Sequence, residues 1–186
     1  MRISKAQAEE NRNRVVVAAS ELFRARGFES VSVADVTRAA GFTHGGFYNH
    51  FDSKEALAAA AVVQAWAAMA AHRAGAADLS ELVASYLSPA SRDTPGKACP
   101  AAALAGDVRR QPDGVRKAFV EGLQDMIAEL EAPLAGDPET RRRRAVALAT
   151  RMIGALILSR AAPDRSALAG ELLSANLAAA REELAS

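Results

Sequence analysis

The sequence predicts an all-α protein, and three observations point to this fold class. Half of the 186 residues are hydrophobic, and alanine, the strongest helix former, makes up about a quarter of the chain. Apolar residues recur at three- and four-residue spacing, which is the period of an amphipathic helix. Only seven prolines and twelve glycines interrupt these segments. No stretch is apolar enough over about 20 residues to predict a membrane-spanning helix.

Nine helical segments follow from this periodicity and from residues that cap helix ends. Gly27 and Gly41 are expected to end the first two helices, and Ser32 with Asp35 forms a capping-box pattern at the start of the second. Segment 88–100, with three prolines and a glycine, predicts a loop. In chain order, the segments cover about residues 9–26, 32–40, 43–51, 53–73, 78–87, 101–110, 113–131, 137–160 and from 163 to near the C-terminus.

Residues 33–51 place two short helices on either side of Gly41. Helices this short are marginal alone, so they need each other and the preceding helix, through Leu22 and Phe23, as a brace. Two short helices joined at a glycine-containing turn are typical of the helix-turn-helix of DNA-binding proteins. Phe47 and Phe51 are expected to pack inside this unit rather than to contact DNA.

Residues 18–57 (AASELFRARGFESVSVADVTRAAGFTHGGFYNHFDSKEAL) resemble the DNA-binding domain of the tetracycline-repressor (TetR) family of bacterial transcription regulators. The FYNHF segment followed by SKEAL is the most specific part of the resemblance. It implies a helix-turn-helix domain over residues 1–52 and a helical effector-binding and dimerisation domain over residues 53–186. It also implies a homodimer in the bacterial cytosol whose partners are a double-stranded DNA operator and a small-molecule effector.

The resemblance further assigns contacts with DNA, position by position. Thr43 matches the cap of the recognition helix, and Tyr48 and Lys54 match residues that contact phosphates. His44 and Asn49 occupy positions that read base edges, and the small Gly45 would let the backbone approach DNA closely. The DNA-binding residues predicted in this way are Ser32, Arg38, Thr43, His44, Gly45, Tyr48, Asn49 and Lys54.

This chain departs from the family pattern in its charge. The recognition helix carries no arginine or lysine, and residues 1–55 hold eight basic against seven acidic side chains. Because phosphate neutralisation makes DNA binding depend on salt, we expect a shallow salt dependence for this chain.

The apolar residues of the helices over 53–131 lie where the resemblance implies an effector cavity. Residues at helical spacing are also typical of a plain core, so Tyr86, whose hydroxyl needs a partner when buried, is the strongest candidate. Cys99 leaves two interpretations open, a buried thiol without a role or a sensor of oxidants or electrophiles. The predicted pocket residues are Trp66, Met69, Tyr86, Cys99, Leu104, Phe119, Leu123 and Met126.

The last two helical segments predict the dimer interface. Residues 145–158 are apolar on nearly every side of their helix, and residues 168–177 supply a second apolar set. A four-helix bundle with a second copy would cover them. Arginines 141–144 are expected to be solvated, with Glu182 and Glu183 of the second copy as candidate partners. The predicted interface residues are Ile153, Leu156, Ile157, Leu168 and Leu172.

Together these patterns predict a repressor that binds a near-palindromic operator and leaves it when an effector binds, with no cofactor and no metal. A ligand-independent regulator and a thiol-sensing repressor that uses Cys99 stay open as alternatives, as does a purely structural helical dimer. An enzyme is not expected, because His44, His50 and His72 lack metal-ligand spacing and no phosphate loop or dinucleotide fingerprint is present.

Overall fold

The structure is a computed structural model that describes residues 4–42, 47, 50–163 and 165–185. Within these residues it contains nine α-helices, one 3-10 turn and no strand, which confirms the all-α fold class. The elements are α1 (Lys5–Arg26), α2 (Val33–Ala39), α3 (Lys54–Arg73), α4 (Leu79–Tyr86), α5 (Pro89–Asp93), the 3-10 turn η2 (Pro95–Lys97), α6 (Pro100–Val108), α7 (Asp113–Glu131), α8 (Pro138–Ala161) and α9 (Ala167–Ala185).

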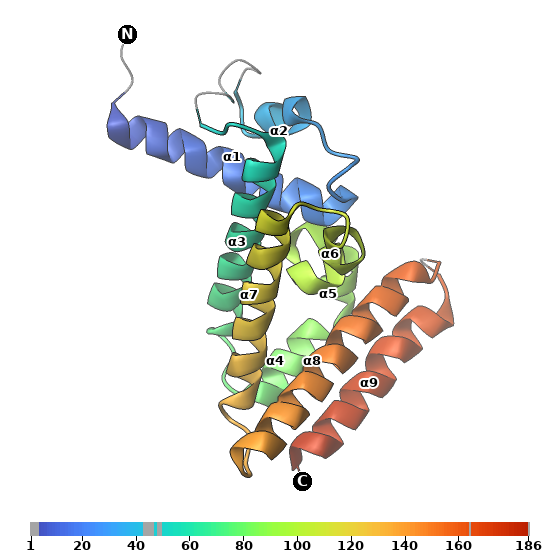
Figure 1. The fold of residues 1–186 in the computed structure, drawn as a ribbon. Helices are drawn as coiled ribbons and strands as arrows, with labels where there is room; N and C mark the ends of the chain where they lie inside the picture. The colour runs from blue at the N-terminus through green and yellow to red at the C-terminus, as the bar shows by residue number, and fades with distance from the viewer. Residues whose placement is uncertain (1–3, 43–46, 48–49, 164, 186) are drawn as a thin grey trace.

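The helices form a small N-terminal unit seated on a larger bundle. Figure 1 shows α1 and α2 at one end of the molecule, with α3 and α7 running side by side away from them. The long helices α8 and α9 pack against each other, and α8 also contacts α7. Both η2 and α6 contact α1, while α5 contacts α8. The segment between α4 and α6 therefore lies between the N-terminal unit and the C-terminal helix pair.

Helix α1 begins at Lys5, four residues earlier than the periodicity predicts. The earlier start follows from Ser4, whose hydroxyl accepts a hydrogen bond of 3.1 Å from the Gln7 N–H and so caps the first turn. At the other end, Gly27 has a φ of 78° and donates its N–H to the Phe23 carbonyl, as the sequence predicts for a terminating glycine.

Segment 88–100 is not the plain loop that its prolines predict. The Ser88 hydroxyl accepts from the Ser91 N–H and caps α5, with Pro89 in the first turn. Pro95 then opens η2, and Pro100 opens α6. Proline at the start of a helix removes only an N–H that would have no partner there, so these prolines begin short helices instead of preventing them.

The predicted helix over residues 43–51 falls largely outside the described residues. Phe47 and Phe51 are described, and both are buried, with ring centroids 5.8 Å apart in a stacked arrangement. Ser53 caps α3 by accepting a hydrogen bond of 3.1 Å from the Ala56 N–H. The two aromatic rings therefore pack as the sequence predicts.

One hydrophobic core runs through the described residues. Phe23 of α1, Leu57 of α3, Leu104 of α6, Met126 of α7 and Leu148 of α8 are all fully buried within it. Burying each side chain of this size stabilises the fold by about 1.5–3 kcal/mol. Because α1 shares this core with the later helices, side-chain packing joins the N-terminal unit to the rest of the molecule, in addition to the covalent connection into α3.

Candidate functional site

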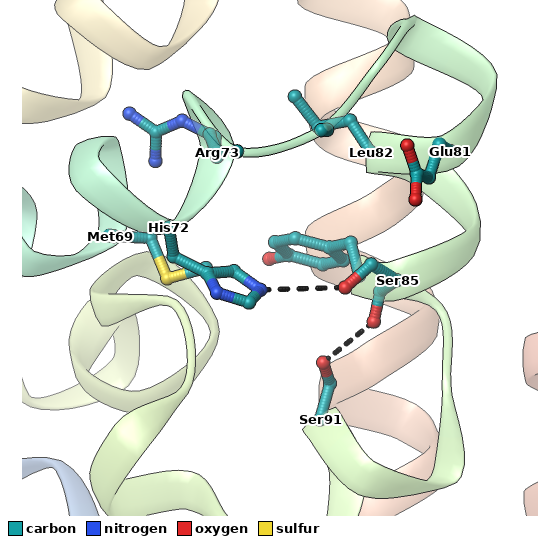
Figure 2. Close-up of a pocket in the computed structure, with 10 residues that line it drawn as sticks. Met69, His72, Arg73, Glu81, Leu82, Ser85 and Ser91 are labelled. Carbon is teal, nitrogen blue, oxygen red and sulfur yellow. Dashed lines mark hydrogen bonds between the residues drawn. The ribbon is translucent and has the colours of Figure 1, made fainter.

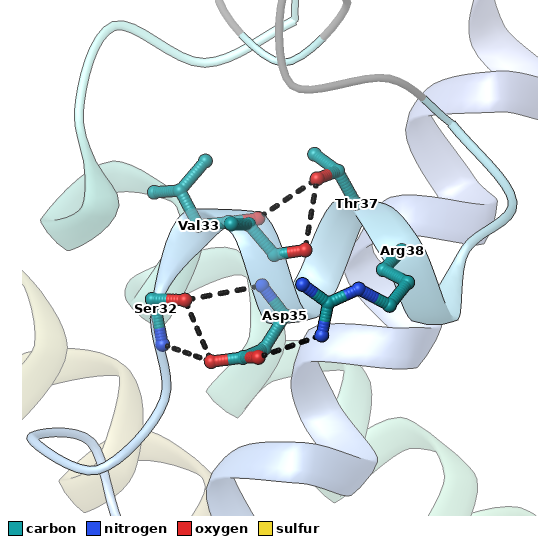
Figure 3. A network of polar contacts seen from close by, with 6 residues as sticks. Ser32, Val33, Asp35, Thr37 and Arg38 are labelled. Carbon is teal, nitrogen blue, oxygen red and sulfur yellow. Dashed lines mark hydrogen bonds and ion pairs between the residues drawn. The ribbon is translucent and has the colours of Figure 1, made fainter.

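The start of α2 is fixed by a reciprocal capping box (Figure 3). The Asp35 N–H donates to the Ser32 Oγ at 3.1 Å, and the Ser32 N–H donates to Asp35 Oδ2 at 3.0 Å. The Ser32 hydroxyl also donates to Asp35 Oδ2 at 2.6 Å. These hydrogen bonds from the Ser32 side chain and backbone hold the pKa of Asp35 below its usual value. The predicted capping box is confirmed, and it satisfies the first N–H groups of α2.

The exposed face of α2 presents a basic side chain. Arg38 is exposed and forms an ion pair of 3.4 Å with Asp35, a contact that is weak at a solvated surface. Thr37, by contrast, is buried and donates its hydroxyl to the carbonyls of Val33 and Ala34 (Figure 3). The Arg38 guanidinium therefore remains largely exposed to solvent despite this ion pair.

Two arginines of α1 brace the turn that follows α2. Arg14 Nη2 donates to the Ala40 carbonyl at 2.8 Å, and its guanidinium lies 4.7 Å from the centre of the Phe42 ring. The Arg12 guanidinium lies 4.8 Å from the centre of the Phe51 ring. Gly41 has a φ of 76°, and a Cβ there would come within 3.1 Å of Arg14 Nη2. In the sequence these two arginines contribute only to the count of charges, whereas the structure places each of them against an aromatic ring of the N-terminal unit.

The predicted DNA-binding residues divide into described and undescribed ones. Ser32 caps α2, Arg38 lies in α2 and Lys54 is the first residue of α3, and the three lie at the same end of the molecule (Figure 1). The remaining five, Thr43, His44, Gly45, Tyr48 and Asn49, lie outside the described residues.

A cavity of about 260 Å³ lies at the other end of α3, between α3, α4 and α5 (Figure 2). Figure 2 shows His72 and Ser85 facing one another, with His72 Nε2 and Ser85 Oγ 3.5 Å apart. The Ser91 hydroxyl donates to the Ser85 carbonyl at 2.9 Å. The residues that line the cavity are Met69, His72, Arg73, Gly75, Ala76, Glu81, Leu82, Ser85, Tyr86 and Ser91.

Tyr86 is the buried polar group of this cavity. Its side chain is 4 % exposed, and its hydroxyl has no hydrogen-bond partner among the described residues. Burial raises the pKa of Tyr86 well above its ordinary value, as does the neighbouring Cys99, while Arg160 and Arg73 act in the opposite direction. The hydroxyl therefore stays protonated near neutral pH, beside the side chain of Cys99.

Two arginines lie near the cavity: Arg73 is buried and lines it, and Arg160 is half-buried and lines a separate hollow beside α5. Arg73 Nε donates to Glu129 of α7 at 2.5 Å, while its Nη1 is buried without a partner. Arg160 of α8 donates to the carbonyls of Ser91 and Arg92, and its Nη1 is also buried without a partner. Sequence reasoning missed both arginines as part of the site, because their partners lie 56 or more positions away along the chain.

The eight predicted pocket residues occupy three different places. Met69 and Tyr86 line the cavity between α3, α4 and α5. Trp66 lines a second hollow between α3 and α7, where its ring packs against Gly122. Cys99 is the N-cap residue of α6, and its side chain is 1 % exposed. The others pack in the core around these hollows: Leu104, Phe119, Leu123 and Met126.

The predicted interface residues of α8 and α9 also differ from one another. Ile157 and Leu168 are exposed, and Ile153 and Leu172 are half-buried. Leu156 is 0 % exposed and lies in the core of the single chain, so we leave it out of the interface.

Charged side chains of α8 make contacts within one chain. Glu183 accepts from Arg151 Nη1 at 2.6 Å, and its carbonyl accepts from Arg144 Nη2 at 2.6 Å. Arg142 pairs with Glu131 of α7 at 3.4 Å. The contacts of Arg144 and Arg151 join the C-terminal end of α9 to α8, and pairing of arginines 141–144 with a second copy stays a prediction.

Two further features bear on the kind of protein this is. In the part of the chain that the structure describes, no three histidine, cysteine, aspartate or glutamate side chains gather closely enough to hold a metal ion. Nor does any helix among those residues have the length and hydrophobicity that a bilayer crossing requires.

Residues 15–61 match the family model described as bacterial regulatory proteins, tetR family. The chain is 42% identical to the uncharacterized HTH-type transcriptional regulator YdgC of Bacillus subtilis over 53 residues. This aligned region covers 28% of this chain and 27% of YdgC. It is 37% identical over 60 residues to the HTH-type transcriptional regulator UidR of Escherichia coli K12, 32% of this chain and 31% of UidR. These matches thus span less than a third of each relative's length. The named proteins are transcriptional regulators and not enzymes, in agreement with the sequence analysis.

The similarity to solved structures extends over nearly the whole chain. The reduced form of E. coli NemR superposes with a TM-score of 0.75 at 21% identity, covering 93% of this chain and 96% of NemR. A TetR-family regulator from Agrobacterium tumefaciens gives a TM-score of 0.74 at 20% identity, covering 95% and 98% of the two chains. At this level of identity the structures show a shared fold, which includes the helices beyond residue 61.

Proposed function

Because the chain belongs to the tetR family of bacterial regulatory proteins, we propose that it is a transcriptional repressor that a small molecule releases from DNA. It would bind a near-palindromic operator as a homodimer in the bacterial cytosol. The observation that carries this proposal is the N-terminal unit, in which α1 and the capping box hold α2 beside the start of α3. A family match over residues 15–61 covers the same unit.

The charges of this unit support contact with a DNA backbone. Arg38 is exposed on α2, and Lys54 opens α3 at the same end of the molecule. Arg12 and Arg14 add two guanidinium groups from α1 beside the turn after α2. In a helix-turn-helix, such contacts set the register of the protein while the second helix reads base edges in the major groove.

Dimerisation would set the distance between two such units. Ile157 of α8 and Leu168 of α9 expose apolar side chains on the two helices that the chain packs against each other. Covering them with the same surface of a second copy gives a twofold arrangement and a four-helix bundle. The two recognition helices would then meet successive major grooves about 34–36 Å apart.

The segment from α5 to α6 offers a route from the cavity to the DNA-binding unit. Ser91 lines the cavity, and its carbonyl accepts a hydrogen bond from Arg160. Seven residues later the Ala98 carbonyl accepts one from Arg24 of α1 at 2.8 Å. An effector that fits the cavity better in a conformation unable to bind the operator would shift the population, and a coupling of about 1–3 kcal/mol changes operator affinity about 5–150-fold.

The alternatives receive less support from this arrangement. A thiol sensor needs an accessible thiolate, whereas Cys99 is almost completely buried at the start of α6. A ligand-independent regulator would not need a cavity of this size between α3, α4 and α5. We therefore favour the ligand-responsive repressor.

The proposal is tested by selecting bound sequences from random DNA duplexes and titrating the selected duplex in a gel shift. Lys54→Ala and Tyr48→Phe are expected to weaken binding by roughly tenfold each, because each removes a phosphate contact. Arg143→Ala is the control, since it removes an exposed positive charge from the start of α8, at the opposite end of the molecule from the N-terminal unit (Figure 1). Failure to select any sequence, or equal affinities for all four proteins, would contradict the proposal.

A further inference from the structure

Helix α2 ends in a tight turn, residues 40–42, which we call the exit turn. Gly41 has a φ of 76°, and its N–H donates to the Arg38 carbonyl at 3.1 Å. The N–H of Phe42 donates to the Thr37 carbonyl at 2.8 Å. These two hydrogen bonds form a Schellman motif, which ends the helix at a left-handed glycine. The direction in which the chain leaves α2 is therefore set within three residues.

One carbonyl of the exit turn receives its hydrogen bond from another helix. The last carbonyls of a helix have no N–H partner further along that helix. At the end of α2, the Ala40 carbonyl accepts a hydrogen bond of 2.8 Å from Arg14 Nη2 of α1, 26 positions earlier in the chain. A cation is also favourable at this end of a helix, where the backbone carries a partial negative charge. Arg14 thus caps the C-terminal end of α2.

The same guanidinium contacts the rest of the exit turn. It lies 4.7 Å from the centre of the Phe42 ring, and a Cβ at Gly41 would come within 3.1 Å of Arg14 Nη2. A planar guanidinium can stack on a ring and donate from its edge at the same time, whereas the ammonium of lysine is a compact point charge. The contacts with three consecutive residues therefore use the shape of arginine as well as its charge.

Two roles are compatible with the position of Arg14. The residue is exposed on α1, so its charge alone would suit a contact with a DNA phosphate. A phosphate contact needs a positive charge, which lysine also supplies, whereas the hold on the exit turn needs the guanidinium fork. The geometry favours the second role, because the Nη2 donor already binds the Ala40 carbonyl.

We infer that Arg14 is a positioning residue that determines sequence specificity by holding the exit turn, without a base contact of its own. This role rests on the proposed function only in treating residues 43–51 as the segment that reads DNA. The exit turn leads directly into that segment, so its direction decides how base edges are met. Binding to unrelated DNA depends on charge instead, and Arg38 and Lys54 supply charge without the exit turn.

Arg14→Lys tests this role, because it keeps the charge and removes the fork. Gel-shift titrations of the full chain measure affinity for a duplex selected from random sequences and for a scrambled duplex of equal length. We expect Arg14→Lys to weaken binding to the selected duplex about tenfold, which is comparable to one mismatched base pair. Affinity for the scrambled duplex should stay within about twofold, with the same dependence on salt.

Arg26→Lys is the matched control. It makes the same substitution at another exposed arginine of α1, outside the predicted DNA-binding residues, and is expected to change neither affinity. A partly unfolded Arg14→Lys protein would lose affinity for both duplexes in the same proportion. The ratio of the two affinities therefore separates positioning from a loss of folded protein.

Hydrogen–deuterium exchange without DNA gives a second readout. The amides of Gly41 and Phe42 are hydrogen-bonded within the exit turn, so Arg14→Lys should speed their exchange about fivefold or more. The amide of the buried Leu148 in α8 should exchange at the rate of the unmodified chain. Faster exchange at all three amides would indicate global destabilisation and contradict a local hold.

Two further results would overturn the specificity role of Arg14: an unchanged affinity for the selected duplex, or an equal loss for both duplexes. Either result, with an unmodified chain that selects a duplex, rejects this role and leaves the proposed function intact. An unmodified chain that selects no duplex rejects the repressor and the specificity role together. The exchange rates of Gly41 and Phe42 then still decide whether Arg14 holds the exit turn.

Discussion

Arg24 of α1 donates a hydrogen bond of 2.8 Å from Nη1 to the carbonyl oxygen of Ala98, which lies 74 positions further along the chain. Its Nε donates to the Ser20 carbonyl at 3.1 Å, so the buried guanidinium joins its own helix to the residue before Cys99. Burial lowers the pKa of Arg24, while Glu21 and then Cys99 act in the opposite direction. The contact fixes the N-terminal unit to the segment that borders the cavity.

Replacing Arg24 should therefore destabilise the fold. Arg24→Met keeps much of the apolar stem but leaves the Ala98 carbonyl without its donor, which should lower the free energy of unfolding by about 1–3 kcal/mol. Urea denaturation measures the change. The exposed Arg26, two positions away, provides the control Arg26→Met, expected to change stability by less than about 0.5 kcal/mol. Equal losses in both variants would contradict a special role for Arg24.

Gly122 should tolerate no side chain. A Cβ at this position would overlap the ring of Trp66, so Gly122→Ala should lower stability by about 1–3 kcal/mol even though alanine favours a helix. In the same helix, a Cβ at Gly114 would meet nothing within 4 Å. Gly114→Ala should leave the melting temperature unchanged or raise it. A Gly122→Ala variant as stable as Gly114→Ala would show that the Trp66 ring is free to move aside.

The capping box of α2 should contribute measurably at neutral pH. Ser32→Ala removes the acceptor for the Asp35 N–H and should lower the free energy of unfolding by about 1 kcal/mol. Ser30→Ala, an exposed hydroxyl deletion two residues earlier, is the control and should have little effect. Chemical denaturation of the three proteins side by side would detect the difference, and identical midpoints would contradict it.

The same capping box should make the free energy of unfolding depend on pH in the acidic range. Hydrogen bonds from Ser32 lower the pKa of Asp35 in the folded state, so its contribution is present above the ordinary value of 3.8 and is lost as the pH falls through the lower folded value. Between about pH 4 and pH 2 the wild type should therefore lose stability more steeply than Asp35→Asn. Unfolding curves across this range give both slopes, and parallel slopes would reject the expectation.

Exposed apolar residues on α8 and α9 should hold two copies together. Leu168→Glu places a charge at a side chain that is 53 % exposed in the single chain, and it should shift the protein from dimer to monomer. Val120→Glu is the control, because Val120 is 49 % exposed but lies on α7. Sedimentation velocity at micromolar concentration separates the two states. If Val120→Glu dissociates the dimer and Leu168→Glu does not, the interface lies elsewhere.

Local signals in the sequence predicted those parts of the fold that depend on neighbouring residues. Ser32 and Asp35 stand three positions apart, and Gly27 closes α1 by an interaction within one turn, so both features were correctly predicted. The short helix α5 was missed because its prolines suggest a loop, although Ser88 provides a cap.

The polar side of the cavity could not be predicted in the same way. Tyr86 and Met69 were identified as apolar or amphipathic residues at helical spacing. Arg73 and Arg160 bind groups that are distant in sequence, and a long charged side chain is ordinarily expected at the surface. Only the packing of α3, α7 and α8 shows that Arg73 is buried and Arg160 half-buried.

The seam between α1 and the later helices limits how this chain can be recombined with its relatives. Besides the Arg24 hydrogen bond, a Cβ at Gly27 would meet Asp107 Oδ2 at 2.5 Å, and a Cβ at Gly96 would meet the Glu21 carbonyl at 3.0 Å. A chimera that exchanged the first fifty or so residues for those of another regulator would need to bring an arginine and a glycine at the positions of Arg24 and Gly27. Exchanging the N-terminal unit of this chain for that of a relative therefore requires keeping the contacts that α1 makes with residues 96–107.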